Sequence, residues 1–205
     1  MSAAATLGTV ALVYVPAAVT PGPNFVLIAH TAAAGSRRAA VAVALGVVAA
    51  GGLLASVAVL GLGTLLASTP WLAHTLRIVC GLYLAYLGVQ LWRHARDPEP
   101  VRVPGAAPPG WWTAFRRGAL GNVTNPKAAI FFGSVLTATL PPTEPVVLKL
   151  AAIALIVVGS TAWHLGVALL FSSASVQKGY GRAKPSLNRV VGVILAALGV
   201  AFTVT

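Results

Sequence analysis

The sequence has few charged residues and almost no acidic ones. Only 8% of its 205 residues are charged, and 3 Asp and Glu stand against 14 Lys and Arg. Soluble domains are about a quarter charged, and they need a polar surface that so few charges cannot supply. Since 58% of the residues are also hydrophobic, the composition excludes an ordinary soluble enzyme and a disordered chain. It indicates an integral membrane protein.

The residues that enzymes and metal sites require are also scarce. Cys80 is the single cysteine, so neither an internal disulfide nor a multi-thiol metal site can form. The sequence shows no HExxH motif, no carboxylate pair and no nucleophile–base pair. We therefore expect no enzymatic activity, no metal and no cofactor.

Long apolar stretches fill most of the chain. A bilayer core of about 30 Å requires roughly 20 apolar residues in a helix. Six stretches reach that length, at about Ala5–Ala34, Ala39–Ala67, Trp71–Trp92, Gly118–Leu140, Leu150–Phe171 and from about Leu187 to the C-terminus. The sequence therefore predicts an all-α membrane protein with six transmembrane helices, forming one domain over residues 1–205.

Basic residues occur in short clusters between these stretches, which argues against a nucleic-acid partner. The second and fourth connections have only Arg77, which lies near the start of the third stretch, and Lys149 on their side, whereas the first, third and fifth hold most of the others. Cytoplasmic loops carry the excess of Lys and Arg in membrane proteins. We therefore expect both termini outside the cytoplasm.

Two of the predicted helices contain residues that interrupt a helix within the membrane. The first carries Pro21-Gly22-Pro23-Asn24, whose two prolines lack backbone donors and clash with the preceding turn. The fourth carries Asn122, then Asn125-Pro126-Lys127. Unpaired backbone is tolerated in lipid only where it faces protein or a wet cavity, and a lysine at that depth is a functional candidate. We therefore expect the two breaks to meet at a polar pocket.

The two halves of the chain have the same plan, a broken helix followed by two continuous ones. Repeat one covers about 1–94, repeat two about 116–205, and a polar loop at 95–115 joins them. Three helices per half require the halves to insert in opposite orientations, which gives an inverted repeat. Small residues such as Gly81, Gly88, Gly192 and Gly199 are assigned to helix packing.

With these motifs in order, the chain resembles the LysE/RhtB family of bacterial amino-acid exporters. The resemblance rests on Pro21-Gly22-Pro23-Asn24, Gly35-Ser36-Arg37-Arg38, Ala44-Leu45-Gly46, the stretch from Gly81 to Gly88, Phe115-Arg116-Arg117-Gly118, Asn122 and Asn125-Pro126-Lys127-Ala128. It implies a secondary exporter of amino acids or related metabolites in the inner membrane, driven by the proton gradient. The partners expected are the substrate, protons and the bilayer, and a homo-oligomer stays open.

The residues at the breaks suggest how such a substrate would bind. Lys127 and the amides of Asn24 and Asn125 suit a carboxylate, and carbonyls freed by Pro21 and Pro23 suit an ammonium. All three acidic residues lie in connections, which favours a neutral or zwitterionic substrate. The predicted binding residues are Pro21, Gly22, Pro23, Asn24, Asn122, Asn125, Pro126 and Lys127.

The residue that couples transport to protons is not fixed by the pattern. Candidates are His164 in the fifth stretch, His30 near the end of the first, and Lys127. A packing role for His164 is an alternative, as it is for Tyr14. A small-solute channel and a membrane protein that only contacts partners stay open as alternative functions.

Overall fold

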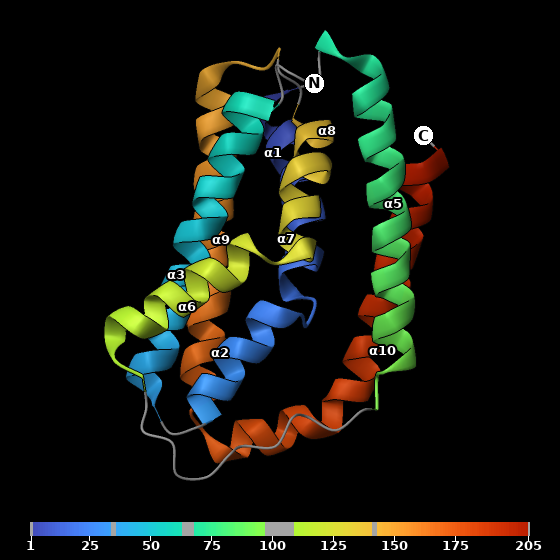
Figure 1. The fold of residues 1–205 in the computed structure, drawn as a ribbon. Helices are drawn as coiled ribbons and strands as arrows, with labels where there is room; N and C mark the ends of the chain where they lie inside the picture. The colour runs from blue at the N-terminus through green and yellow to red at the C-terminus, as the bar shows by residue number, and fades with distance from the viewer. Residues whose placement is uncertain (1, 34–35, 63–67, 97–108, 141–142, 205) are drawn as a thin grey trace.

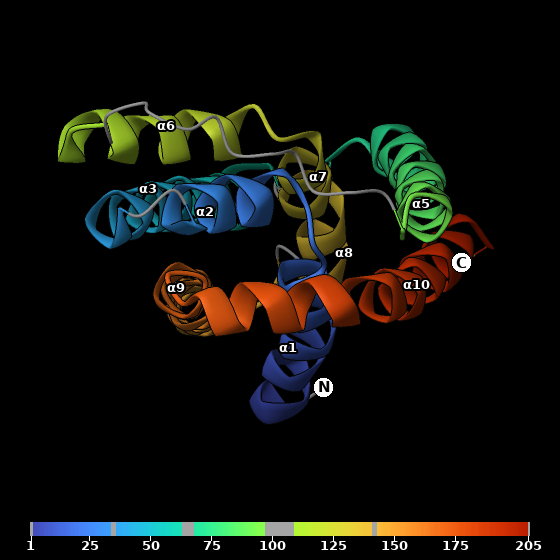
Figure 2. The ribbon, with the colours of Figure 1, turned by 90° about the horizontal axis from the view of Figure 1, so that it is seen from below.

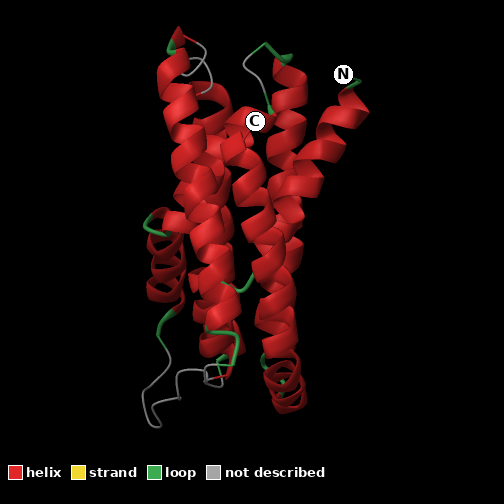
Figure 3. Ribbon diagram, turned by 90° about the vertical axis from the view of Figure 1, so that its right-hand side faces the viewer, coloured by secondary structure: helices red, strands yellow, loops and turns green. Residues whose placement is uncertain are grey.

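The computed structural model describes residues 2–33, 36–62, 68–96, 109–140 and 143–204. These residues form helices joined by loops and turns, without a strand (Figure 3). The polar loop predicted at 95–115 falls largely on residues 97–108, and the end of the second predicted helix on 63–67. Both segments lie outside the described residues.

The first predicted membrane helix is broken where the sequence indicates. Helix α1 (Ala3–Val19) ends as Thr20 N donates to Pro16 O at 3.1 Å, and α2 (Pro23–Ala33) follows at an angle of 51°. Prolines at 21 and 23 cannot donate the next backbone hydrogen bonds, so the helix cannot continue through them. The hydrogen bonds resume where Val26 N donates to Gly22 O.

The fourth predicted helix is broken at its asparagine–proline motif. Helix α6 (Trp111–Val123) stops before Asn125, whose Oδ1 accepts from Lys127 N at 3.0 Å and caps α7 (Pro126–Ile130). A π-helical segment η2 (Phe131–Leu136) and α8 (Thr137–Thr139) continue from α7. Helix α6 begins at Trp111, whereas the predicted apolar stretch begins near Gly118. The first turns of the helix contain Arg116 and Arg117, and a stretch defined by apolar residues excludes them.

The remaining helices are α3 (Arg37–Val57), which continues into π-helical η1 (Ala58–Leu62), α5 (Pro70–Arg93), α9 (Val146–Leu170) and α10 (Ala174–Val204). In the described part of the chain, α3 with η1 and α9 are each long and apolar enough to cross a membrane, and the bent α1–α2 pair gives a third crossing if counted as one. The arrangement of six spans therefore stays a prediction.

Helix α10 starts earlier than the sequence indicates. It begins at Ala174, whereas the apolar stretch begins near Leu187, and it contains Pro185. Its first part crosses beneath the other helices and its last part rises beside α5 (Figures 1 and 2). Only the second part is apolar enough to be predicted as a span, because the first is rich in basic and polar residues.

Glycines allow two pairs of helices to touch through their backbones. A Cβ added at Gly46 or Gly118 would overlap backbone atoms across the α3–α6 contact. Added at Gly88, it would lie 2.5 Å from Gly192 O across the α5–α10 contact, and Gly81 and Gly199 meet in the same way. The packing role predicted for Gly81, Gly88, Gly192 and Gly199 is confirmed. Small residues bring helices close in lipid, where dispersion replaces the hydrophobic drive.

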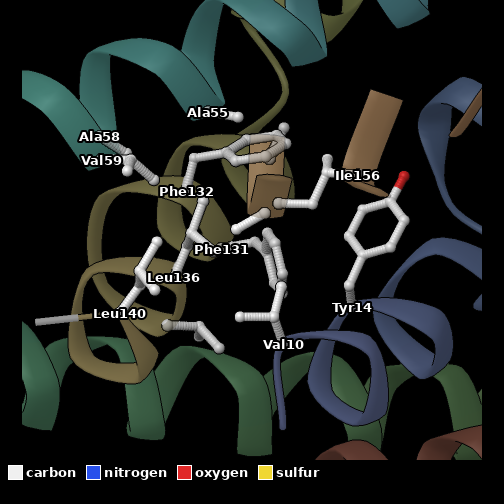
Figure 4. Packing of buried hydrophobic residues seen from close by; sticks show 13 residues of the cluster. Val10, Tyr14, Ala55, Ala58, Val59, Phe131, Phe132, Leu136, Leu140 and Ile156 are labelled. Atoms are coloured by element: carbon white, nitrogen blue, oxygen red, sulfur yellow. The ribbon is translucent and has the colours of Figure 1, made fainter. Parts of the chain in front are cut away.

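Two buried clusters lie on either side of the helix breaks. One joins Val10 and Tyr14 of α1 to Phe131 and Phe132 of η2 and to Ile156 of α9 (Figure 4). The other packs α2 and the N-terminal half of α3 against α6 and the end of α9. Helices α1, α2, α3, α6, α7 and α9 therefore surround a common space at the level of the breaks.

Candidate functional site

Two side-chain hydrogen bonds join the broken helices directly. Asn24 Nδ2 donates to Asn122 Oδ1 at 2.8 Å, and Lys127 Nζ donates to the carbonyl oxygen of Thr20 at 2.9 Å. The partners are about a hundred residues apart in sequence. The expectation that the two breaks meet is confirmed, and the meeting point is polar.

The orientation of Asn122 is fixed by a third helix. Its Nδ2 donates to Val47 O of α3 at 2.8 Å. Because a carbonyl only accepts, Oδ1 of Asn122 must face Asn24, and Asn24 must present Nδ2 to it. This leaves Asn24 Oδ1 buried and without a hydrogen-bond partner among the described residues. The pocket thus holds an acceptor that the described chain leaves unused.

Lys127 brings a cation to the same place. It is the second residue of α7, and its Nζ and Cδ lie 3.5 Å from where a Cβ on Gly22 would be. No carboxylate pairs with it in the described ranges, and its hydrogen-bond acceptor there is the Thr20 carbonyl. A neutral dipole compensates an ammonium poorly at membrane depth. An anion at this position would be strongly favoured.

A pocket opens between these groups. Its empty volume is about 610 Å³, open side included. Polar residues from the breaks line it together with apolar and aromatic residues. The lining is Tyr14, Ala17, Ala18, Thr20, Gly22, Asn24, Phe25, Val47, Gly51, Asn122, Asn125, Lys127, Ala128, Phe131, Phe132, Ile156, Ser160 and His164.

Helix α9 supplies a second polar group to the pocket. Ser160 and His164 are both buried, and His164 Nδ1 lies 2.9 Å from Ser160 O and 3.1 Å from Ser160 Oγ. Tyr14 of α1 lines the same pocket as these two residues.

The predicted site residues divide into those that line the pocket and those that shape it. Gly22, Asn24, Asn122, Asn125, Lys127 and His164 line it, whereas Pro21 and Pro23 do not. The two prolines break the backbone, and Pro126 starts α7; the Pro126 side chain lies outside the described part. His30 sits in the last turn of α2, away from the pocket.

Sequence reasoning missed several residues of the lining. Phe131 and Phe132 belong to the π-helical segment η2, and Ser160 lies four residues before His164 on one face of α9. Tyr14, a packing residue by pattern, contacts Phe131 at 5.7 Å between ring centroids. The spacing of Ser160 and His164, four residues apart in an apolar helix, was the sequence signal that could have placed Ser160 at the pocket. No pattern marks Phe131 or Phe132.

A membrane-embedded helical protein with a polar pocket at two helix breaks has the features of a solute carrier. The family model of the LysE type translocator matches residues 15–205. The chain therefore belongs to the LysE type translocator family, a family of membrane transporters and not of enzymes.

Curated relatives agree with this assignment. A threonine efflux protein of Escherichia coli (strain K12) is 33% identical over 196 residues, 94% of each chain, and that of Salmonella typhi is 31% identical over 194 residues, again 94% of each. A leucine efflux protein of Salmonella choleraesuis is 28% identical over 132 residues, 62% of this chain and 59% of the relative. No solved structure matches the chain.

Proposed function

We propose that the protein exports neutral α-amino acids from the cytoplasm as a secondary transporter coupled to protons. The observation that carries the proposal is the pocket at the meeting of the two helix breaks, which contains one lysine and no acidic side chain in its described lining. The chain belongs to a translocator family and is similar to threonine and leucine efflux proteins, which supports an amino acid as the substrate.

The two charged groups of an amino acid match the polar residues of the pocket. Its carboxylate would take the place of the Thr20 carbonyl on Lys127, because a charge-assisted hydrogen bond is roughly twice as strong as a neutral one. The freed Thr20 oxygen and the unused Asn24 Oδ1 are then two acceptors for the ammonium. Asn122 holds Asn24 in place, and Asn125 holds the backbone of Lys127.

The charge of the lining selects a neutral side chain. A lysine or arginine substrate would bring a second cation next to Lys127, with no acidic residue in the described lining to compensate it. The threonine and leucine named for the relatives have uncharged side chains. Basic amino acids are therefore expected to be poor substrates.

Proton coupling is assigned to the protonatable side chains that line the pocket. His164 and Lys127 both do so, whereas His30 lies elsewhere. A proton on either residue changes the charge that the substrate meets. Export of the substrate can therefore be exchanged against entry of a proton at the same site. We propose His164 and Lys127, and not His30, as the coupling residues.

The pairing of helices supports an inverted repeat of residues 1–94 and 116–205. Helix α3 of the first half packs on α6 of the second, and α9 of the second half packs on α1 and α2 of the first. The third helices of the halves, α5 and α10, pack on each other. A two-fold relation in the membrane plane produces these pairings. In the inner membrane, the basic clusters would then face the cytoplasm, with both termini outside.

The purified protein in proteoliposomes tests the function. A pH gradient across the vesicle membrane should drive labelled threonine or leucine to accumulate on the acidic side, above its equilibrium concentration. Lysine should not accumulate. Transport that stops at equal concentrations on both sides would indicate a channel. Accumulation that ignores the pH gradient would contradict proton coupling.

A further inference from the structure

The first part of α10 is a helix that packs on little of the described chain. No described side chain from Ala174 to Ser186 is buried, and a Cβ added at Gly179 would meet nothing within 4 Å. The close contacts of α10 with α5 lie further along the helix, at Gly192 and Gly199. The described protein therefore offers this segment no surface that would hold it in place.

The segment is also a poor helix by its own sequence. Ser175, Gly179 and Gly181 lower its helix propensity, and Pro185 lacks a backbone donor for its last turn. A helix of roughly 12 residues is marginal in water even when it is rich in alanine. An external surface is therefore needed to stabilise the helix at this place.

The residues of the segment divide into two faces. Lys178 and Arg182 are four residues apart and both exposed, so one face is basic. Val176 and Ala183 are seven residues apart and, by helical geometry, share the opposite face. A helix with basic residues on one face and apolar residues on the other is typical of segments that lie in the interface of a membrane.

The segment also lies where a membrane surface is expected. It follows the end of α9 directly and crosses beneath the other helices instead of running along them (Figures 1 and 2). Glu144, the acidic residue of the described ranges, precedes α9 at the opposite end. The end of the molecule with the segment instead holds further exposed basic residues, at Arg37, Arg38, Arg93 and Arg96.

We propose that Ala174–Pro185 is an interfacial helix that binds anionic phospholipid on the side of the basic clusters. Lys178 and Arg182 contact the lipid phosphates, and Val176 and Ala183 enter the edge of the hydrocarbon. A soluble acidic partner would match the charges but would leave the apolar face without a surface. The inference goes beyond the proposed function and is independent of the substrate and of proton coupling.

Spin labels test where the two faces lie, in a Cys80→Ser background and in nanodiscs that contain phosphatidylglycerol. A nitroxide at Ala183→Cys should be reached by oxygen and shielded from a water-soluble nickel chelate. Ala174→Cys is the matched control, because it is exposed and nine residues away on the opposite face, and it should show the reverse. Two labels equally open to the nickel chelate would overturn the proposal and favour a soluble partner.

Titration of the labelled protein in detergent with phosphatidylglycerol tests the charge of the lipid. Lys178→Gln and Arg182→Gln should each raise the concentration that half-shields the Ala183 label about fivefold, and added salt should raise it further. Ser175→Gln removes no charge and should match the wild type.

Phosphatidylcholine or inorganic phosphate should not replace phosphatidylglycerol in this titration. Equal shielding by phosphatidylcholine, or unchanged titrations for both charge variants, would overturn the anionic lipid site. Because no measurement here uses transport, these outcomes leave the proposed function intact. A protein that exports no amino acid but shows the expected shielding would contradict the proposed function alone.

Discussion

Asn24 and Asn122 link the two broken helices through a single hydrogen bond of 2.8 Å, and its direction is set by the Val47 carbonyl behind Asn122. The bond leaves Asn24 Oδ1 buried and open to a donor. A buried amide oxygen is costly to leave without a donor, so we expect a bound substrate to supply one.

Asn24→Ala should abolish export, because it removes both the bond to Asn122 and the acceptor for the substrate ammonium. The variant should still insert, since α1 and α2 retain their apolar contacts. Uptake by proteoliposomes and the amount of folded protein in the membrane check the two statements. Asn188→Ala changes a buried asparagine of α10 outside the pocket and should retain transport. Normal export by Asn24→Ala would remove Asn24 from the site.

Lys127→Ala should also abolish export at normal expression, because the substrate carboxylate loses its counter-charge. Lys127→Arg keeps a cation but changes its shape, and should retain only part of the activity, since the Thr20 carbonyl lies 2.9 Å from Nζ. Binding of labelled threonine to the detergent-solubilised protein measures the loss. Lys178→Ala, at an exposed lysine of α10, serves as the comparison. If Lys127→Ala binds threonine as tightly as the wild type, the carboxylate binds elsewhere.

Gly46→Ala should destabilise the protein through the contact of α3 with α6. Its Cβ would overlap the Phe115 carbonyl oxygen, which cannot move without shifting α6. Overpacking of this kind costs about 1–3 kcal/mol, measurable as a lower midpoint of thermal unfolding in detergent. Gly166→Ala, where a Cβ meets nothing within 4 Å, is the control and should be neutral or stabilising. Equal midpoints for the two variants would contradict the close helix contact.

The orientation in the membrane can be read from labelling at the two ends of α9. In a Cys80→Ser background, Thr143→Cys should react with an impermeant maleimide added to whole cells. Ser173→Cys should react only after the membrane is opened, because it lies on the side of the basic clusters. Both positions are exposed. The reverse pattern would invert the proposed topology.

The positions of the two breaks could be predicted from local sequence, because proline acts on its own backbone in any surroundings. Pro21 and Pro23 end α1, and Pro126 with the Asn125 cap starts α7. The apolar stretches did not give the starts of α6 at Trp111 and of α10 at Ala174, since polar turns can extend a helix beyond its membrane segment. The sequence did not show that Tyr14 lines the same pocket as Ser160 and His164, because these residues come from two helices far apart in the chain.

The sequence by itself determined that the chain lies in a membrane, where its helices break and that its charge is concentrated in basic clusters. These properties follow from local chemistry, from the cost of polar groups in lipid and from the missing proline donors. Only the tertiary structure decided that Lys127 reaches Thr20, that Asn24 keeps an open acceptor, and that Tyr14 and His164 line one pocket. Such relationships depend on how helices approach one another, and the close contacts at Gly46 and Gly118 that set this approach become visible only after folding.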